Sequence, residues 1–420
     1  MTAPVDLVLA VINGYYLDDE LRDALRDRAA QDTIRRVHLR GIRSAILLNS
    51  IISSIATEGE ETQSKNVESF IVESNDIPPV DLTAFLSRYH LQKLQRLRLL
   101  GCRISSWDVL GLQTMALTTL ELILSIESSP IPTLSQTLSI FSSNPLLQRI
   151  VLSYNSTLPV GGGDTPSLQV PLPHLKELHL TSDFWHAFGL LNRLELPAEM
   201  DSLHLDLHGC SHADISRTLG PYLGNFIRRR RRFPDGGLGL LSFPTLYHLD
   251  FNAGDTHRDD DSADGVWFVE VSAVLAEELE EGEGADRLYL DLVAHVPRER
   301  VIKLQTTLPI LRSEELCIEM CDLARLCLAD VDLSTWFVEP DIREPHTFKD
   351  VLRGLDHIEI REPILSDGDW GPLTDFLSRR AAVGNPISSL RLISHPHMDE
   401  DVVESIKCVV KDVYLDDQRT

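Results

Sequence analysis

The chain has 420 residues, and its 39 Lys and Arg against 64 Asp and Glu give a formal net charge of −25 at pH 7. So acidic a surface repels the phosphate backbone of nucleic acids, and we expect no nucleic-acid partner. Residues 44–56, the most apolar stretch, are interrupted by Asn49 and several serines. They fall short of the roughly 20 apolar residues that span a bilayer, so we expect no membrane partner.

The first 30 residues are expected to form an N-terminal cap, with a charged helix over residues 18–30. A secretory signal peptide begins with basic residues, whereas residues 1–9 contain Asp6 and no Lys or Arg. The six cysteines are too scattered for a disulfide framework, which favours free intracellular thiols. We therefore expect a cytoplasmic or nuclear protein.

A six-residue pattern, Leu-x-x-Leu-x-Leu, recurs along the chain and is typical of leucine-rich repeats. Strict copies begin at Leu94, Leu117, Leu175, Leu191 and Leu323. Looser copies begin at Ile34, Val67, Leu147, Met200, Leu246, Leu355, Ile387 and Val410. The copies at 34, 67, 94, 117, 147, 175 and 200 are 33, 27, 23, 30, 28 and 25 residues apart. These intervals straddle the usual repeat length of about 20–29 residues, as irregular repeats would.

The repeat consensus continues with Asn or Cys three positions after its last leucine. Cys102 takes this position after Leu99, and Asn75 and Asn155 take it in two looser copies. A side chain there is expected to hydrogen-bond to backbone as the chain leaves the strand.

Between these copies the apolar period becomes helical. Leu134, Leu138 and Phe141 form one helical stripe, which is expected to end at Asn144-Pro145. Leu373, Phe376 and Leu377 form another, which is expected to end at Asn385-Pro386. A strand, a return helix and a corner with proline make one coil of a solenoid.

The pattern therefore predicts an α/β fold, a curved and irregular leucine-rich-repeat solenoid. Parallel strands would line its concave face, and helices and irregular turns its convex face. The expected organisation is a cap at 1–30, repeats at 31–232, a loop-rich acidic insertion at 233–286, repeats at 287–416 and a tail at 417–420. Two solenoid blocks hinged near the insertion are the alternative to one continuous solenoid.

Residues between the leucines should point outward from the concave face, because side chains alternate along a strand. Their mixed chemistry favours binding a protein over binding one small molecule. The candidate protein-binding residues are Arg96, Arg98, Thr119, Glu121, Glu177, His179, Arg325, His357, Glu359, Ser389 and Arg391.

A run of arginines occupies 228–232, and two acidic stretches follow it, at 255–264 and 277–286. The run Arg228, Arg229, Arg230, Arg231 and Arg232 has two interpretations. It is either a nuclear-import signal or acidic-partner patch, or an exposed end of the preceding helix, where Arg is favoured by the helix dipole. The acidic stretches lack the ligand register of a calcium loop and are expected to be solvated.

No pattern for catalysis, cofactor binding or metal binding is found. Cys317, Cys321 and Cys327 have no nearby His to complete a zinc site. The glycines at 161–163 lack the Lys-Ser/Thr of a phosphate-binding loop. We therefore expect no catalytic residue, no cofactor and no metal.

Several segments resemble the repeat region of F-box proteins of mushroom-forming fungi: LPHLKELHL at 172–180, DSLHLDLHGC at 201–210, LARLCLADVDLSTWF at 323–337 and residues 368–392. The resemblance covers roughly 30–415. It implies a substrate receptor for a cullin-based ubiquitin ligase, but the Leu-Pro-x-Glu-type helix that begins an F-box does not occur near residue 1. A cullin-ligase partner is therefore expected only if an F-box is restored.

These observations predict a monomeric, non-catalytic protein-binding solenoid whose partner is a protein, with the acidic charge favouring a basic one. Two alternatives remain open. One is a stand-alone scaffold or inhibitor with no ligase link, and the other is an enzyme on a leucine-rich fold without repeats.

Overall fold

The structure is a computed structural model, and it describes the following part of the chain. The continuous ranges are 5–10, 34–42, 67–74, 93–107, 116–124, 131–154, 169–229, 237–244, 248–256, 266–275, 291–297, 301–306, 322–329, 331–337, 352–365, 369–396 and 398–416. Single residues are also described at 20, 23, 24, 27, 46, 47, 50, 51, 81, 82, 83, 86 and 320. The chain divides into two compact units, Met1–Leu207 and His208–Thr420.

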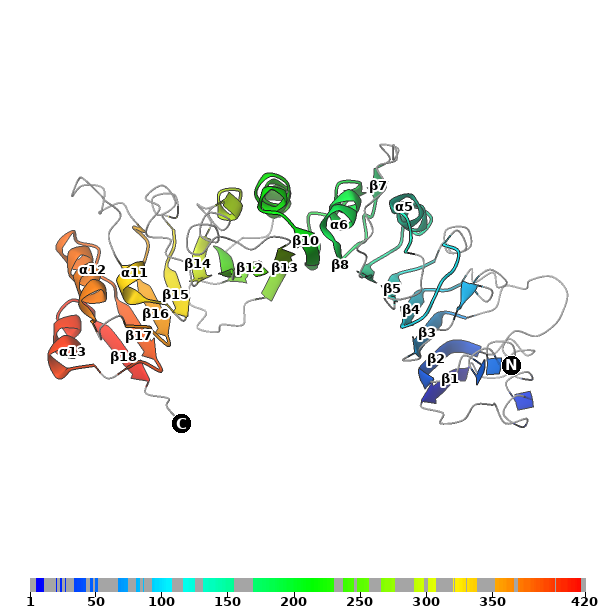
Figure 1. The fold of residues 1–420 in the computed structure, drawn as a ribbon, viewed down its shortest axis with the longest axis horizontal. Coiled ribbons are helices and arrows are strands. Elements are labelled where there is room, and N and C mark those ends of the chain that lie inside the picture. The colour runs from blue at the N-terminus through cyan, green and yellow to red at the C-terminus, as the bar shows by residue number, and fades with distance from the viewer. Residues whose placement is uncertain are drawn as a thin grey trace. The chain divides into compact units, whose positions relative to one another are not determined.

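The first unit contains a sheet whose strands lie side by side in the order of the sequence (Figure 1). Every pair from β1 to β8 is parallel. Its strands are β1 (Val5–Ala10), β2 (Ile34–Ile42), β3 (Ser69–Ser74), β4 (Arg96–Leu100), β5 (Thr119–Ile123), β6 (Arg149–Ser153), β8 (Glu177–Asp183) and β10 (Ser202–Cys210), the last of which ends beyond Leu207.

The leucine pattern explains where these strands form. From β3 to β10, each strand begins two residues after the first apolar residue of its copy, as Arg96 follows Leu94. In β4, Leu97 and Leu99 are fully buried, whereas Arg96 between the apolar positions is exposed. The strict copy at Leu191 behaves differently, since it covers the end of α6 (Phe184–Leu191) and β9 (Leu194–Glu195). β9 pairs only with β7 (Val170–Pro171), in a separate two-stranded sheet.

The expected helix over Leu134, Leu138 and Phe141 is α5 (Leu134–Ser142). Its first turn is fixed by a capping box, in which Thr133 and Gln136 exchange hydrogen bonds between side chain and backbone. At its other end the buried Asn144 donates its Nδ2 to the carbonyl oxygen of Ile140 at 2.8 Å. α5 and α6 cover one side of the strands β5 to β8 (Figure 1).

β1 extends the parallel sheet into the segment that the sequence assigned to an N-terminal cap. Its partner is β2, with Leu7 opposite Val37 and Leu9 opposite Leu39. Of the helix expected over residues 18–30, the described residues Glu20, Asp23, Ala24 and Asp27 are helical.

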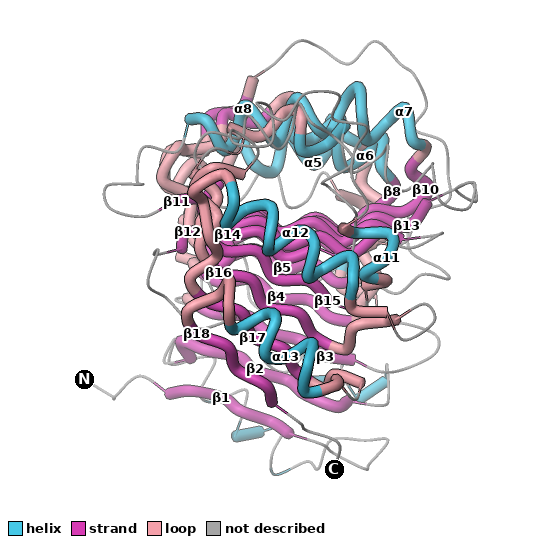
Figure 2. Tube along the Cα trace, turned by 90° about the vertical axis from the view of Figure 1, so that its left-hand side faces the viewer, coloured by secondary structure: helices cyan, strands magenta, loops and turns pink. Residues whose placement is uncertain are grey.

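The second unit begins with helices and continues into a mixed sheet. Its sheet order is β13-β12-β11-β14-β15-β16-β17-β18, and every pair from β11–β14 to β17–β18 is parallel. The helices α11, α12 and α13 stand on one side of β15 to β18 (Figure 2). The elements are α7 (His212–Asp214), a π-helix (Ile215–Leu219), α8 (Gly220–Arg229), β11 (Gly237–Pro244), β12 (His248–Thr256), β13 (Val266–Leu275), β14 (Val301–Thr306), β15 (Arg325–Ala329), α11 (Leu333–Trp336), β16 (His357–Arg361), α12 (Gly371–Ala382), β17 (Ser389–Ile393), α13 (Glu400–Lys407) and β18 (Asp412–Asp416).

The segment 233–286, expected to be rich in loops, instead contains the three strands β11, β12 and β13. They form antiparallel pairs, β11 with β12 and β12 with β13. Alternate apolar residues anchor them, and Leu238, Leu240, Phe251, Val269 and Val271 are all buried. Apolar residues alternate with other residues along these strands, a pattern that differs from the leucine repeat. Loops were expected because the acidic stretches around the strands were given more weight. The copy at Leu246 accordingly leads into an antiparallel strand.

The fold is therefore α/β, with parallel strands paired in sequence order over most of each unit's sheet. No helix among the residues that the structure describes combines the length and the apolar character needed to traverse a bilayer.

Candidate functional site

All the candidate outward residues lie on strands, and each is followed directly by a buried residue of the repeat pattern. Those from Arg96 to His179 belong to the first unit and those from Arg325 to Arg391 to the second. Each group is therefore described on the sheet of its own unit. Most of these side chains are exposed or half-buried, but Glu121 and Glu359 are buried, with 9% and 8% of their surface exposed. Each of these two carboxylates is held by arginines.

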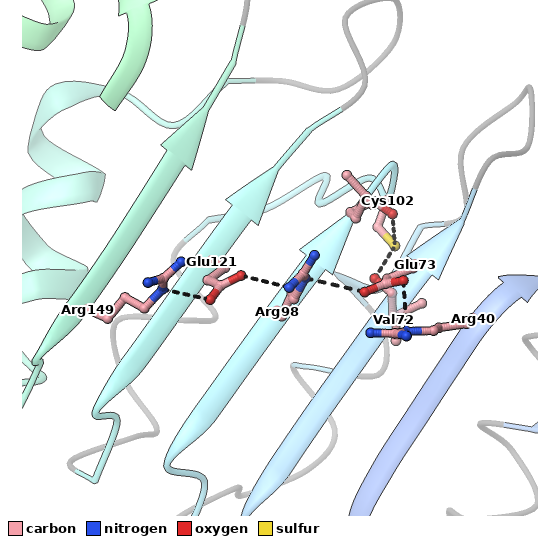
Figure 3. A network of polar contacts seen from close by, with 8 residues as sticks. Arg40, Val72, Glu73, Arg98, Cys102, Glu121 and Arg149 are labelled. Carbon is pink, nitrogen blue, oxygen red and sulfur yellow. Dashed lines mark hydrogen bonds and ion pairs between the residues drawn. The ribbon is translucent and has the colours of Figure 1, made fainter. Parts of the chain in front are cut away.

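In the first unit, six alternating charges form a continuous ladder across neighbouring strands. Figure 3 shows its part from Arg40 to Arg149. We call it the charge ladder; its members are Arg40, Glu73, Arg98, Glu121, Arg149 and Glu177, on β2, β3, β4, β5, β6 and β8.

The ladder is built from short nitrogen–oxygen contacts. Glu73 lies 3.0 Å from Arg40 and 3.4 Å from Arg98, and Glu121 lies 3.3 Å from Arg98 and 3.0 Å from Arg149. Arg149 also pairs with Glu177. The register of the parallel strands places Arg40 opposite Glu73, Arg98 opposite Glu121 and Arg149 opposite Glu177, and the contacts that join these three pairs run diagonally between strands.

The sequence reasoning found Arg98, Glu121 and Glu177 but missed Arg40, Glu73 and Arg149. The sequence does contain a pattern that predicts the ladder, because charges of opposite sign occupy neighbouring outward positions in successive copies of the repeat. With three arginines and three glutamates the ladder is formally neutral. The side chains of Glu73 and Glu121 are only 16% and 12% exposed, so two arginines around each one offset the desolvation of its charge.

Beyond the ladder, the first unit presents two imidazole rings in contact, tilted by 57° to each other. The rings of His179 on β8 and His204 on β10 lie with centroids 4.1 Å apart. The Thr181 hydroxyl lies 3.4 Å from Nε2 of His179. His179, a candidate residue, is therefore half-buried against a second histidine.

In the second unit, the outward side chains of β14 to β18 line a hollow of about 680 Å³. All the candidate residues of this unit contribute to it. Its lining residues are Lys303, Gln305, Ala324, Arg325, Cys327, Asp356, His357, Glu359, Arg361, Ser388, Ser389, Arg391, Asp412, Tyr414 and Asp416.

Ion pairs hold part of this lining in place. Arg361 donates its Nε to Glu359 at 2.6 Å, and Arg391 donates its Nε to Asp416 at 2.8 Å. Cys327 lies opposite Glu359 on the neighbouring strand, and burial, reinforced by the carboxylate of Glu359, raises the pKa of its thiol to about 11. The thiol therefore stays protonated at neutral pH and acts as a small apolar side chain.

The repeat position of Cys102 behaves as the consensus implies. The residue is fully buried, and its Sγ lies 3.5 Å from the carbonyl oxygen of Leu100, which it meets as a weak donor. Burial raises the pKa of the thiol to about 12. The other two predicted turn residues, Asn75 and Asn155, lie outside the described residues.

The remaining sequence candidates are only partly described. Arg228 and Arg229 are exposed in the last turn of α8, and Arg230, Arg231 and Arg232 lie outside the described residues. Cys317 and Cys321 also lie outside them. Within the part of the chain that is described, no three His, Cys, Asp or Glu side chains come together in a way that would hold a metal ion.

Comparison with models of known protein families finds no match, and comparison with curated proteins finds no significantly similar sequence. Function must therefore be inferred from the sheet surfaces themselves.

Proposed function

We propose that this chain is a leucine-rich-repeat solenoid that binds another protein through the sheet face opposite its buried leucines, and that it catalyses no reaction. One observation carries the proposal. Strand after strand of the leucine pattern pairs in register with the next copy, from β2 to β8 and again from β15 to β18. Such stacking buries one row of leucines and leaves a broad row of varied side chains outside.

The chemistry of the outer face favours a protein partner. The face presents arginines, histidines, serine and tyrosine, and many of its charges are already fixed in ion pairs with each other. Pre-ordered polar groups cost little conformational entropy on binding and give specificity through complementary charge.

The place of the chain in a ubiquitin ligase is the second part of the proposal and comes from the resemblance to fungal F-box proteins. In that arrangement the sheet face holds the substrate, and a cullin core joins through an F-box. A stand-alone scaffold or inhibitor would use the same face without the cullin core.

Site-directed photo-crosslinking in the native cell tests the binding face. A photo-reactive amino acid replaces Ser389, on the outward side of β17, or Ser378, exposed on α12. The expected result is a discrete crosslinked protein from position 389 and none from position 378. Crosslinking from 378 alone would place the partner on the helices and overturn the proposed face.

The ligase link needs its own experiment. The endogenous protein, tagged at its C-terminus, is purified from its own cells and analysed by mass spectrometry. Recovery of a cullin and its adaptor supports the ligase role. Recovery of the same crosslinked partner without a cullin favours the scaffold or inhibitor.

A further inference from the structure

Within the described strands β1 to β8, the outward side of the sheet carries one arginine without a carboxylate partner. Arg36 pairs with Asp6 at 3.4 Å, and the arginines of the charge ladder each contact one or two glutamates. Arg96, on β4, lies on the same side of the sheet and is exposed. Its guanidinium has no ion-pair or hydrogen-bond partner among the residues that the structure describes.

The register of the strands places a hydroxyl group on each side of Arg96. Ser69 on β3 and Thr119 on β5 lie directly opposite it, and both residues are half-buried. Neither hydroxyl has a hydrogen-bond partner in the described part of the chain. Neighbouring strands lie about 4.8 Å apart, so one guanidinium and two hydroxyls can reach the same bound group. We call Ser69, Arg96 and Thr119 the donor row.

The charge ladder beside the donor row does not supply an anion to it. Glu73 and Glu121, the ladder's carboxylates on β3 and β5, each already lie between two arginines (Figure 3). Because the ladder is formally neutral, Arg96 adds a single positive charge to this part of the surface. The whole chain has a formal net charge of −25, so the donor row is a local exception that attracts an anionic group.

We propose that the donor row binds the carboxylate of an aspartate or glutamate in an extended segment of the protein partner. The guanidinium of Arg96 pairs with both carboxylate oxygens, and the two hydroxyls donate to the lone pairs that remain. A carboxylate carries one negative charge, which matches the one charge of Arg96, whereas a phosphorylated side chain carries about −1.5 to −2. This inference rests on the proposed function, since it names a group of the partner that the sheet face would hold.

An apolar contact lies farther along the same two strands. Leu100 on β4 and Ile123 on β5 lie opposite each other, on the outward side of the sheet, and both are half-buried. Leu100 is four residues beyond Arg96, a distance of about 13 Å in a strand. A partner segment that runs along β4 therefore places an apolar side chain on this pair when that side chain is four positions from the acidic one. This second contact favours a peptide over a small anion.

The test selects peptides without fixing their sequence in advance. A display library of random seven-residue peptides is selected on the immobilised full chain at low ionic strength. The expected result is enrichment of peptides that carry Asp or Glu, with Leu, Ile, Val or Phe four positions away in either direction. Enrichment of peptides without an acidic residue, or of no peptide at all, would overturn the inference.

Charge reversal ties the selected peptide to the donor row. In fluorescence anisotropy, Arg96→Glu should weaken binding about tenfold, because it replaces a paired charge with a repelling one. A peptide with Lys in place of its acidic residue should then bind Arg96→Glu more tightly than it binds the unaltered chain. Arg353→Glu, at an exposed position of the second unit, makes the same change in net charge. This control should change the affinity by less than about twofold, because salt screens distant charges.

The two hydroxyls give a smaller and separate effect. Ser69→Ala and Thr119→Val should each weaken the selected peptide about twofold to threefold, since each removes one hydrogen-bond donor. The same two variants should leave the Lys-containing peptide unaffected, because a lysine side chain accepts no hydrogen bond.

Equal weakening by Arg96→Glu and Arg353→Glu would overturn the inference, because net charge alone would then explain the binding. Displacement of the peptide by inorganic phosphate at a similar concentration would make the donor row a small-anion site and would also overturn it. Tighter binding of an analogue with phosphoserine in place of the acidic residue would contradict the choice of a carboxylate. If position 389 crosslinks a partner while Arg96→Glu changes nothing, only this inference fails. If position 378 alone crosslinks, the proposed function itself fails.

Discussion

Arg380 donates its Nη2 to the carbonyl oxygen of Leu355 at 3.0 Å, joining α12 to the turn before β16. The same guanidinium donates to the carbonyl oxygens of Leu352 and Asn385, both at 3.1 Å. Arg380 is 1% exposed, and burial lowers its pKa to about 10, so it remains charged at neutral pH. Leu352, one of its partners, has a φ of 47°, a left-handed conformation that is costly for a bulky residue.

Removing this guanidinium should therefore destabilise the second unit. Arg380→Met leaves three carbonyl groups without their donor and should lower the free energy of unfolding by about 3 kcal/mol. Arg380→Lys should cost a similar amount, because one ammonium group lacks the planar fork that reaches three acceptors. Urea unfolding followed by tryptophan fluorescence measures both. The exposed neighbour gives the control, and Arg379→Met should change stability by about 0.5 kcal/mol or less.

Two glycines with the same backbone conformation should respond differently to alanine. Gly101 and Gly209 have φ values of 65° and 68°. A Cβ at Gly101 would stand 1.9 Å from the carbonyl oxygen of Ser74, whereas nothing lies within 4 Å at Gly209. We expect Gly209→Ala to cost about 1 kcal/mol for its left-handed φ, and Gly101→Ala to cost about 3 kcal/mol or more. If both variants lost the same stability in thermal unfolding, the end of β3 at Ser74 would have to shift away from residue 101 at little cost.

Neutralising the centre of the charge ladder should weaken the first unit in a salt-dependent way. Glu121→Gln removes the carboxylate shared by Arg98 and Arg149. Both arginine side chains are more than a third exposed, so water screens the interaction and the expected loss is about 1 kcal/mol at low salt. The loss should shrink as salt rises. Glu195→Gln, exposed on β9 and outside the ladder, is the control for urea unfolding at both salt concentrations and should show neither effect.

Acid should destabilise the first unit through His186. This histidine is 6% exposed, with its ring 5.5 Å from that of Tyr154, and burial lowers its pKa below the ordinary value of 6.5. The unfolded chain then binds a proton more readily than the folded chain, so stability is lost as the pH falls through 6.5 toward the lowered pKa.

The slope from this one group can reach about 1.4 kcal/mol per pH unit. His186→Gln should remove that part of the slope, and His174→Gln, at an exposed position, should leave it intact. Hydrogen exchange of the α6 amides between pH 5 and 7 reports the difference. An unchanged slope in His186→Gln would assign the acid sensitivity to other groups.

Leucine spacing predicted most of the parallel strands, because each leucine that repeats the pattern is buried against the next copy. It also matched at Leu191, where the chain instead forms the end of α6 and the short β9. It missed a strand where another residue replaces leucine. In β14, Leu304 and Thr306 lie opposite Leu326 and Leu328 of β15, so the final leucine of the pattern is missing there. Thr306 is nevertheless fully buried.

The candidate surface was predictable only as a list of outward positions. Alternation along a strand indicates which side chains face out. Which of these side chains form ion pairs with each other depends on the register between strands that lie some 25 to 30 residues apart in the sequence. Arg149 illustrates the difference, since nothing in its own copy of the repeat reveals that it bridges Glu121 and Glu177.

The antiparallel strands β11, β12 and β13 have a consequence for how the second unit folds. The segments that join β11 to β12 and β12 to β13 are short, whereas each parallel pair from β14 to β18 joins strands separated by a longer segment of chain. Short loops close sooner and at lower entropic cost. We expect the unit to nucleate at 237–275 and to grow outward strand by strand, so that β18, farthest from the nucleus, is the last to acquire protection.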